Sequence, residues 1–326
     1  MKPLIRLYRG YANEQELIVM GHVIAPTTRQ EYDFQKSGFK HARNIIRVFR
    51  VKTSSNAEVH LECGPLKVTT KTLEDGHFKF CIPLEAAASG PITYGWQPYE
   101  VYIEHNGKQV RAKGTFIRPH EGRFGFISDI DDTFLVSHTR NAFKKLYVLL
   151  FRNLNKRKIF EDVVAHYQAL STTGKSNKNE MNAFFYVSSS EWNLYRFIVD
   201  FTKMHDLPRA VMLLKDIKTS LTDFFLTGRG NHNHKFEKIR HILEFYPNLK
   251  YTLLGDDSQE DPFLYEAICK IFPVTVMAVY IRQTGSHQKP RALAAIQNME
   301  TMGVKACYFK DSSEAIEHSR RIGLIS

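Results

Sequence analysis

Cysteine and proline are both scarce in this chain of 326 residues. The four cysteines show no CxxC spacing and no dense framework, which excludes a disulfide-built secreted scaffold and favours reduced thiols in a cytosolic protein. Only 12 residues are proline and 43% are hydrophobic, which excludes intrinsic disorder as the global state. The chain is long enough to bury a sizeable core, and two domains are expected rather than one.

Long apolar runs are also missing from the sequence. The longest, such as Phe272–Ile281, are well short of the ~20 residues that span a bilayer, so no transmembrane helix is expected. Near Met1, the charged residues Arg6, Arg9 and Glu14 interrupt the apolar stretch that a signal peptide needs. We therefore expect a cytoplasmic protein, with peripheral contact at a membrane left open.

Negative charge is in deficit, because 45 lysines and arginines face 34 aspartates and glutamates, for a net charge of +11. A basic surface of this kind favours polyanionic partners, which include nucleic acid, an anionic membrane and a phosphorylated substrate. Net charge alone does not distinguish these three classes.

Residues 1–118 are predicted to form an all-β, sandwich-like accessory domain, followed by a linker at 118–122. Within it, Asp75-Gly76 and Asn106-Gly107 separate short apolar strands and supply the positive φ angles that tight hairpins need. The predicted strands cover residues 17–20, 44–49, 68–73, 77–81, 100–103 and 109–112.

Residues 119–326 show a different hydrophobic pattern, in which short apolar segments typical of strands alternate with longer segments of helical periodicity. This alternation predicts a parallel sheet with helices on both faces, whose active site lies beyond the carboxyl ends of the strands. Strands are expected at 124–128, 183–188, 209–214, 251–255, 274–281 and 306–309, and helices at 191–205, 235–245 and 262–271.

Two of these apolar strands end in carboxylates. The first runs into Asp129 and Asp131, and the second runs into Asp256 and Asp257, followed by Asp261. Acids crowded at a strand end repel one another unless a cation or hydrogen bonds compensate them. Brought together at one edge of a parallel sheet, they form a set of hard oxygen ligands suited to Mg²⁺. The alternative is that these acids only cap the turns that follow.

Groups suited to holding a phosphate lie near the same predicted edge. Ser188 begins a run of three serines at a strand-to-helix junction, where hydroxyls and backbone N–H groups form an anion cradle. Lys235 begins the helix before the Asp256 strand, so its ammonium can reach the same edge. The alternatives are an ordinary helix N-cap for Ser189 or Ser190 and a solvated surface charge for Lys235.

These residues carry a resemblance to a known family. In chain order, four motifs resemble those of the haloacid dehalogenase superfamily of phosphatases: Asp129-x-Asp131-x-Thr133, Ser188, Lys235 and Gly255-Asp256-x4-Asp261. A narrower resemblance, to the phosphatidate phosphatases related to the fungal actin-patch enzyme, rests on Tyr8–Tyr11, Asp129–Thr133, Ser188–Tyr195, Gly255–Pro262 and Tyr280–Arg282. It implies a Rossmann-like catalytic domain of the haloacid dehalogenase type at 119–326, with a small basic flap or cap inserted at about 138–180.

The resemblance also implies a reaction. Asp129 attacks phosphorus and forms an aspartyl-phosphate, while Asp131 serves as general acid and then as general base. Thr133 orients the loop that carries both acids. Ser188 and Lys235 hold the phosphoryl oxygens, where charge accumulates in the transition state.

The resemblance further implies Mg²⁺ as the cofactor. Its ligands are expected to be Asp129, the backbone carbonyl of Asp131, and Asp256, with Asp257 or Asp261 binding directly or through water. Asp257 stands where the family usually has serine, a departure that bears on the metal geometry.

The function implied is that of a hydrolase, a Mg²⁺-dependent phosphatidate phosphatase that acts on a phospholipid and releases diacylglycerol and phosphate. Within the insert, residues 143–151 follow a basic amphipathic pattern that suits either docking on anionic lipid or packing on the sheet. Two other functions stay open: a phosphatase of a soluble phosphomonoester or phosphoprotein, and a non-catalytic basic module that binds anionic lipid or nucleic acid. For the enzyme, nucleic acid is not expected as a partner.

Overall fold

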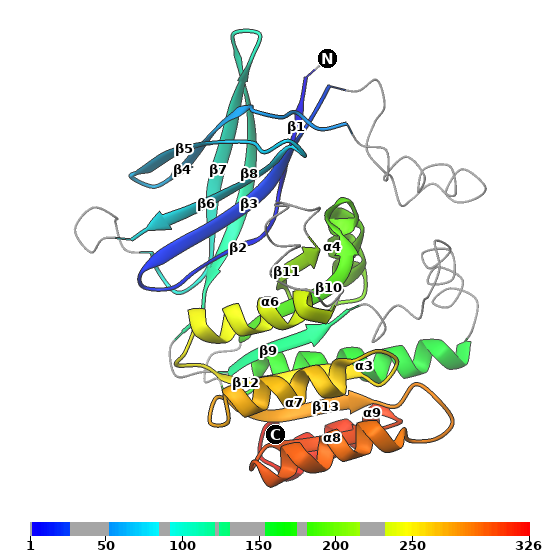
Figure 1. Ribbon diagram of the computed structural model, residues 1–326. Coiled ribbons are helices and arrows are strands. Elements are labelled where there is room, and N and C mark those ends of the chain that lie inside the picture. The colour runs from blue at the N-terminus through cyan, green and yellow to red at the C-terminus, as the bar shows by residue number, and fades with distance from the viewer. Residues whose placement is uncertain are drawn as a thin grey trace. The chain divides into compact units, whose positions relative to one another are not determined.

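The structure, a computed structural model, describes residues 2–26, 52–84, 92–120, 124–130, 154–174, 181–215 and 232–326 (Figure 1). The chain divides into two compact units. The first holds the described residues up to Pro119 together with Glu191–Arg196, and the second holds the other described residues from His120 onward. Several predictions lie outside the described residues, namely the strand at 44–49, the helical pattern at 143–151, Asp131 and Thr133.

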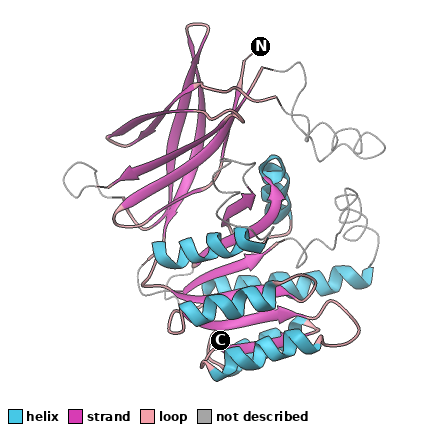
Figure 2. Cartoon of the chain, in the orientation of Figure 1, coloured by secondary structure: helices cyan, strands magenta, loops and turns pink. Residues whose placement is uncertain are grey.

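The first unit is an antiparallel β region, drawn almost wholly as strands in Figure 2. Its described strands form one sheet in the order β1-β3-β2-β8-β7-β4-β5, with β6 paired to β3, and only the β2–β8 pair is parallel. The strands are β1 (Leu4–Leu7), β2 (Gly10–Ala12), β3 (Glu16–Ile24), β4 (Glu58–Cys63), β5 (Leu66–Lys71), β6 (His77–Pro83), β7 (Gly95–His105) and β8 (Lys108–Arg118).

Alternation of burial along the strands builds the core of this unit. In β6, for example, Phe78, Phe80 and Ile82 are buried, whereas Lys79 and Cys81 between them are exposed. Successive side chains of a strand point to opposite faces, so a period of two residues places every second side chain in the core. Apolar residues from the other strands of the sheet join the same buried cluster.

Both predicted turns are present, but only one closes a hairpin. Asn106 and Gly107 have φ angles of 51° and 70°, and they join β7 to β8, with His105 opposite Lys108. Gly76 also has a positive φ of 78°. The strands on either side of it do not pair with each other, however, because β5 pairs with β4 and β6 pairs with β3. The hairpin expected at Asp75-Gly76 is therefore wrong, although the turn is correct.

The segment Glu191–Arg196 belongs to the first unit through aromatic contacts. The ring of Trp192 stacks on His22, with centroids 3.7 Å apart and an interplanar angle of 9°. Burial, followed by the nearby charges, lowers the pKa of His22 to about 2, so this stacked imidazole is neutral. The Tyr195 hydroxyl accepts a hydrogen bond from Arg9 N at 2.7 Å, and its ring lies 4.5 Å from that of Tyr8.

The second unit is built on a six-stranded sheet in the order β11-β10-β9-β12-β13-β14. The pairs from β10 through β14 are parallel, as the alternating pattern predicts. The strand order reverses at β9, which lies between β10 and β12. The strands are β9 (Phe124–Asp129), β10 (Ala183–Glu191), β11 (Ala210–Lys215), β12 (Lys250–Asp256), β13 (Val276–Arg282) and β14 (Lys305–Phe309).

Helices cover this sheet on both faces, with α6, α7 and α8 side by side on one face and α3 and α9 on the other (Figure 1). The helices predicted at 235–245 and 262–271 are confirmed as α6 and α7, although α6 begins three residues before Lys235. The helix predicted at 191–205 begins later, as α4, because β10 continues through Glu191 and a 3-10 turn follows; α3, α8 and α9 were not predicted. Among the described helices, none is both long and apolar enough to cross a membrane. The helices are α3 (Leu154–Thr172), α4 (Tyr195–Met204), α6 (His232–Phe245), α7 (Asp261–Ile271), α8 (Pro290–Thr301) and α9 (Ser312–Arg321).

Candidate active site

The carboxyl ends of β9 and β12 lie next to each other where the strand order reverses. Ser128 in β9 is opposite Leu254 in β12, so Asp129 and Asp256 end neighbouring parallel strands. Both side chains are buried, with exposed fractions of 2% and 0%. Open parallel sheets bind ligands at such a reversal, because the loops leave the two strands in opposite directions and open a crevice.

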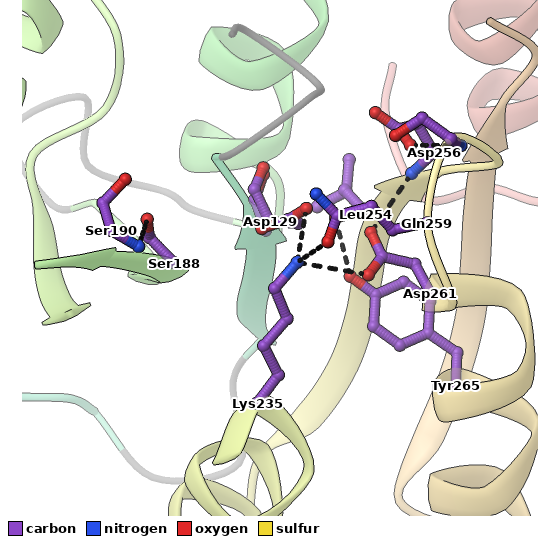
Figure 3. Close-up of polar contacts among 11 residues, drawn as sticks. Asp129, Ser188, Ser190, Lys235, Leu254, Asp256, Gln259, Asp261 and Tyr265 are labelled. Carbon is purple, nitrogen blue, oxygen red and sulfur yellow. Dashed lines mark hydrogen bonds and ion pairs between the residues drawn. The ribbon is translucent and has the colours of Figure 1, made fainter. Parts of the chain in front are cut away.

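Lys235 brings a positive charge to these acids from the first turns of α6. Its Nζ lies 2.9 Å from Asp129 Oδ2 and 3.5 Å from Asp261 Oδ1, and it donates to Gln259 Oε1 at 3.4 Å (Figure 3). Lys235 is itself buried, which excludes the alternative of a solvated surface charge. An ammonium between two buried carboxylates offsets part of the cost of removing all three charges from water. We call Asp129, Lys235, Asp256 and Asp261 the acid–lysine site.

The first turn of α7 holds Asp261 close to β12. Asp261 Oδ2 accepts a hydrogen bond from Asp256 N at 3.4 Å, and the Tyr265 hydroxyl donates to Leu254 O at 2.9 Å. Burial raises the pKa of Tyr265 well above its ordinary value, so the phenol stays a donor. Gly255 permits this approach, since a Cβ there would lie 2.6 Å from Asp261 Oδ2 and 2.9 Å from the Tyr265 hydroxyl.

Ser188 lies on the other side of Asp129 from Asp261 (Figure 3). It follows Val187, which is opposite Asp129 in the β9–β10 pair, and it is fully buried. Its Oγ accepts a hydrogen bond from Ser190 N at 2.9 Å. Because β10 continues through Glu191, neither Ser189 nor Ser190 caps a helix here.

A tyrosine of α3 contacts the end of β9, which was not predicted from the sequence. The Tyr167 hydroxyl lies 3.0 Å from Ser128 Oγ, which in turn donates to the backbone oxygen of Asp129 at 2.9 Å. Burial raises the pKa of Tyr167, so its hydroxyl stays protonated. Tyr167 belongs to the predicted insert, where nothing local in the sequence indicates a contact with a strand end.

Asp257, predicted as a possible metal ligand, is engaged in a separate cluster of residues. One carboxylate oxygen accepts hydrogen bonds from Thr284 N at 2.9 Å and from the Thr284 hydroxyl, and the other accepts from the Tyr308 hydroxyl at 2.6 Å. Lys289 Nζ bonds to the Asp257 backbone oxygen. We call Asp257, Thr284, Lys289 and Tyr308 the Asp257 cluster.

The acid–lysine site fits Mg²⁺ by the chemistry of its donors. Asp129, Asp256 and Asp261 are buried carboxylates that supply hard oxygen atoms at one edge of a sheet. Within the described ranges, no group of three or more His, Cys, Asp or Glu side chains is arranged to hold a metal ion. The loop that carries Asp131 lies outside those ranges. By residue type, the described carboxylates that could contribute oxygen ligands are Asp129, Asp256 and Asp261, but together they do not form a set already arranged around one ion.

Residues 124–283, which contain this site, match the family model of the catalytic domain of phosphatidate phosphatase APP1. This segment is similar to the APP1 catalytic domain. Phosphatidate phosphatase APP1 of Saccharomyces cerevisiae (strain ATCC 204508 / S288c) is 26% identical over 164 residues, which are 48% of this chain and 25% of that protein. The chain thus spans about a quarter of the length of this curated relative.

Two solved structures show distant likenesses to this chain. A carbohydrate acetylesterase from Xanthomonas citri matches with a TM-score of 0.34 and 10% identity, over 99% of this chain and 74% of that one. A β-glucuronidase from Parabacteroides merdae matches with a TM-score of 0.27 and 9% identity, over 93% of this chain and 40% of that one. At these TM-scores neither likeness supports an argument about this chain.

Proposed function

We propose that the chain is a Mg²⁺-dependent phosphatidate phosphatase of the haloacid dehalogenase type, which hydrolyses the phosphomonoester to diacylglycerol and phosphate. One observation carries the proposal: Asp129 is buried at the end of β9 with Lys235 Nζ 2.9 Å from its carboxylate. A buried carboxylate beside an ammonium, at the edge where a parallel sheet binds ligands, is suited to attack on a phosphoryl group. The APP1-like segment that contains both residues supports phosphatidate as the substrate.

In the proposed reaction, a carboxylate oxygen of Asp129 bonds to phosphorus while the bond from phosphorus to the lipid alkoxide breaks. Asp131 gives its proton to the departing alkoxide and later takes one from the water that hydrolyses the aspartyl-phosphate. Thr133 orients the loop that carries Asp129 and Asp131. Lys235 and Ser188, on either side of Asp129, hold the phosphoryl oxygens as negative charge develops on them.

When bound, Mg²⁺ supplies Lewis-acid stabilisation of the phosphoryl oxygens. Asp129, Asp256 and Asp261 are the described residues that would hold it, together with the backbone carbonyl of Asp131. Residues 1–118 act as an accessory domain, and the enzyme is expected in the cytoplasm with peripheral contact at an anionic membrane. The basic insert at about 138–180 is the proposed contact.

Phosphate release from phosphatidate in mixed micelles, compared with release from short soluble phosphomonoesters, tests the substrate. We expect phosphatidate to be hydrolysed with the higher kcat/KM, and EDTA to abolish turnover until Mg²⁺ is restored. Faster turnover of soluble esters would instead assign the second enzyme function. No turnover of any phosphomonoester, including a generic aryl phosphate with Mg²⁺, would leave only the basic binding module.

A further inference from the structure

Asp256 and its neighbour Asp257 are both buried and both accept hydrogen bonds: Asp256 Oδ1 accepts from Ser258 N at 2.7 Å, and Asp257 accepts on both of its oxygens. The Asp257 side chain has an exposed fraction of 0%. The carboxylate accepts from the backbone N and the hydroxyl of Thr284 and from the hydroxyl of Tyr308, and Lys289 Nζ lies 3.8 Å from Oδ1. An ionised carboxylate is an acceptor only, so these three donors can satisfy both of its oxygens without a metal ion.

The contacts of Asp257 fix both ends of the connection between β13 and α8. At the first end, Thr284 is bound through its backbone N and its hydroxyl. At the second end, Lys289 bonds through Nζ to the Asp257 backbone oxygen, and its backbone N donates to the Tyr308 hydroxyl at 2.9 Å. Between these two ends, residues 285–288 are exposed.

The same contacts also hold the chain just beyond β12. Asp257 N donates to Arg282 O at 3.0 Å, which extends the β12–β13 pairing by one residue past Asp256. Through the hydrogen bonds that its carboxylate accepts, Asp257 therefore links three segments: the end of β12, the connection at 283–289, and Tyr308 on β14. Asp256, the adjacent residue, belongs to the acid–lysine site.

We propose that Asp257 is a positioning residue, which fixes the connection at 283–289 beside the acid–lysine site, and that it is not a metal ligand. For Asp257 to coordinate an ion directly, the part-buried N–H and O–H donors that point at its oxygens would have to give up these hydrogen bonds, and the connection would lose its attachment to β12. The proposal rests on the proposed function only in naming the metal site; the fixing of the connection is independent of catalysis.

Amide hydrogen exchange tests the positioning role directly, because Thr284 N and Lys289 N are donors in the Asp257 cluster. In Asp257→Ala and in Tyr308→Phe, we expect exchange in the peptide 283–289 to rise about fivefold or more, as expected for a lost hydrogen bond. Thr284→Val removes only the hydroxyl donor and should give a smaller rise. If Asp257→Ala does not fold, hydrogen exchange in Tyr308→Phe alone tests the positioning role. Unchanged exchange in Tyr308→Phe would overturn the positioning role.

Binding of Mn²⁺, followed by electron paramagnetic resonance as a substitute for Mg²⁺, tests the second half of the proposal. Asp257→Asn should bind Mn²⁺ within about twofold of the unchanged protein, whereas the matched variant Asp256→Asn should bind it at least about tenfold more weakly. Equal weakening in both variants would make Asp257 a ligand and overturn the proposal. If the unchanged protein binds no Mn²⁺, the proposed function fails, while hydrogen exchange still decides the positioning role.

Discussion

The acid–lysine site and the Asp257 cluster begin at adjacent residues of one strand end, yet they compensate buried carboxylates by different means. In the first, Asp129 and Asp261 face the ammonium of Lys235. In the second, Asp257 accepts hydrogen bonds from the hydroxyls of Thr284 and Tyr308 and from a backbone N–H, while the half-exposed ammonium of Lys289 lies farther off, 3.8 Å from Oδ1. The Lys235 ammonium, at the end of a long side chain, can turn toward an arriving phosphate, whereas the backbone N–H of Thr284 cannot turn away from Asp257 while the connection keeps its conformation. The comparison separates carboxylates available for chemistry from carboxylates that hold structure.

Asp129→Asn is expected to have the largest effect, because it removes the proposed nucleophile while keeping the shape of the side chain. Turnover should fall at least about 10⁴-fold. Phosphate release under saturating Mg²⁺ measures the loss, and circular dichroism checks that the fold is retained. Activity near that of the unchanged enzyme would remove the acid–lysine site from the chemistry altogether.

Lys235→Met is expected to lower kcat by about 10²–10³-fold, the usual cost of losing one donor to a developing oxyanion. It should also lower stability, because Asp129 and Asp261 lose a buried positive charge. Lys270→Met, on the exposed face of α7, is the matched control and should change neither quantity. Lys235→Arg keeps the positive charge but changes the shape of the donor group. Full activity in that variant would mean that catalysis needs only a positive charge here, and not an ammonium at this position.

Lowering the pH is expected to reduce stability through a third group of buried polar residues, which carries no carboxylate. In this group, His166 Nε2 lies 2.8 Å from Ser319 Oγ. Burial, with a smaller effect of His318, lowers the pKa of His166 from 6.5 to about 4. The unfolded chain therefore binds the proton more readily, and stability is lost as the pH falls from about 6.5 toward about 4. The loss attributable to this group is about 3 kcal/mol.

Urea unfolding at pH 7, 5.5 and 4.5 measures this dependence, with His166→Gln as the variant that cannot titrate. The variant should be less stable at neutral pH and should lose less stability on acidification. An identical slope in both proteins would show that His166 does not contribute.

Gly255→Ala is expected to have the smallest of these effects on stability, at about 1–3 kcal/mol for an overpacked contact. Its Cβ would meet Asp261 Oδ2 and the ring of Tyr265, so it should also displace Asp261 and lower activity. Thermal unfolding and turnover measure the two effects. Gly303→Ala is a useful contrast: nothing lies near its Cβ, but its φ of 85° makes it costly for stability alone.

Local sequence pattern was enough to predict most strands and several helices of the second unit. Apolar runs that end in acids predicted Asp129 and Asp256 at strand ends, and the two strands that carry them, β9 and β12, are neighbours in the sheet. The partners of Asp257 could not be predicted in the same way, because Thr284 and Tyr308 are 27 and 51 residues away in the chain. Their proximity depends on which strands pair, and residue pattern does not determine this.

Helix α9 and the pairing of the strands around Asp75-Gly76 were also not predicted correctly from local pattern. Helix α9 buries Ser312, His318 and Ser319, so it lacks an apolar stripe, although Asp311 and Glu314 form a capping box that could have indicated its start. The turn at Asp75-Gly76 was predicted from its own chemistry, but the partners of its two strands depend on residues elsewhere in the sheet. Asp131 and Thr133 lie outside the described residues, and their roles stay predictions.

The stacking of Trp192 on His22 has a practical consequence for dissecting this protein. The chain passes from Ser188 and its neighbours straight into a segment whose aromatic contacts are made with residues 8–22. A fragment truncated to begin at residue 119 would lack His22 and Arg9. The Trp192 indole would then lose its stacking partner, and the Tyr195 hydroxyl would lose the hydrogen bond from Arg9 N. Its failure to turn over substrate would therefore say little about where the catalytic groups are, and point substitutions in the full-length chain are the cleaner route.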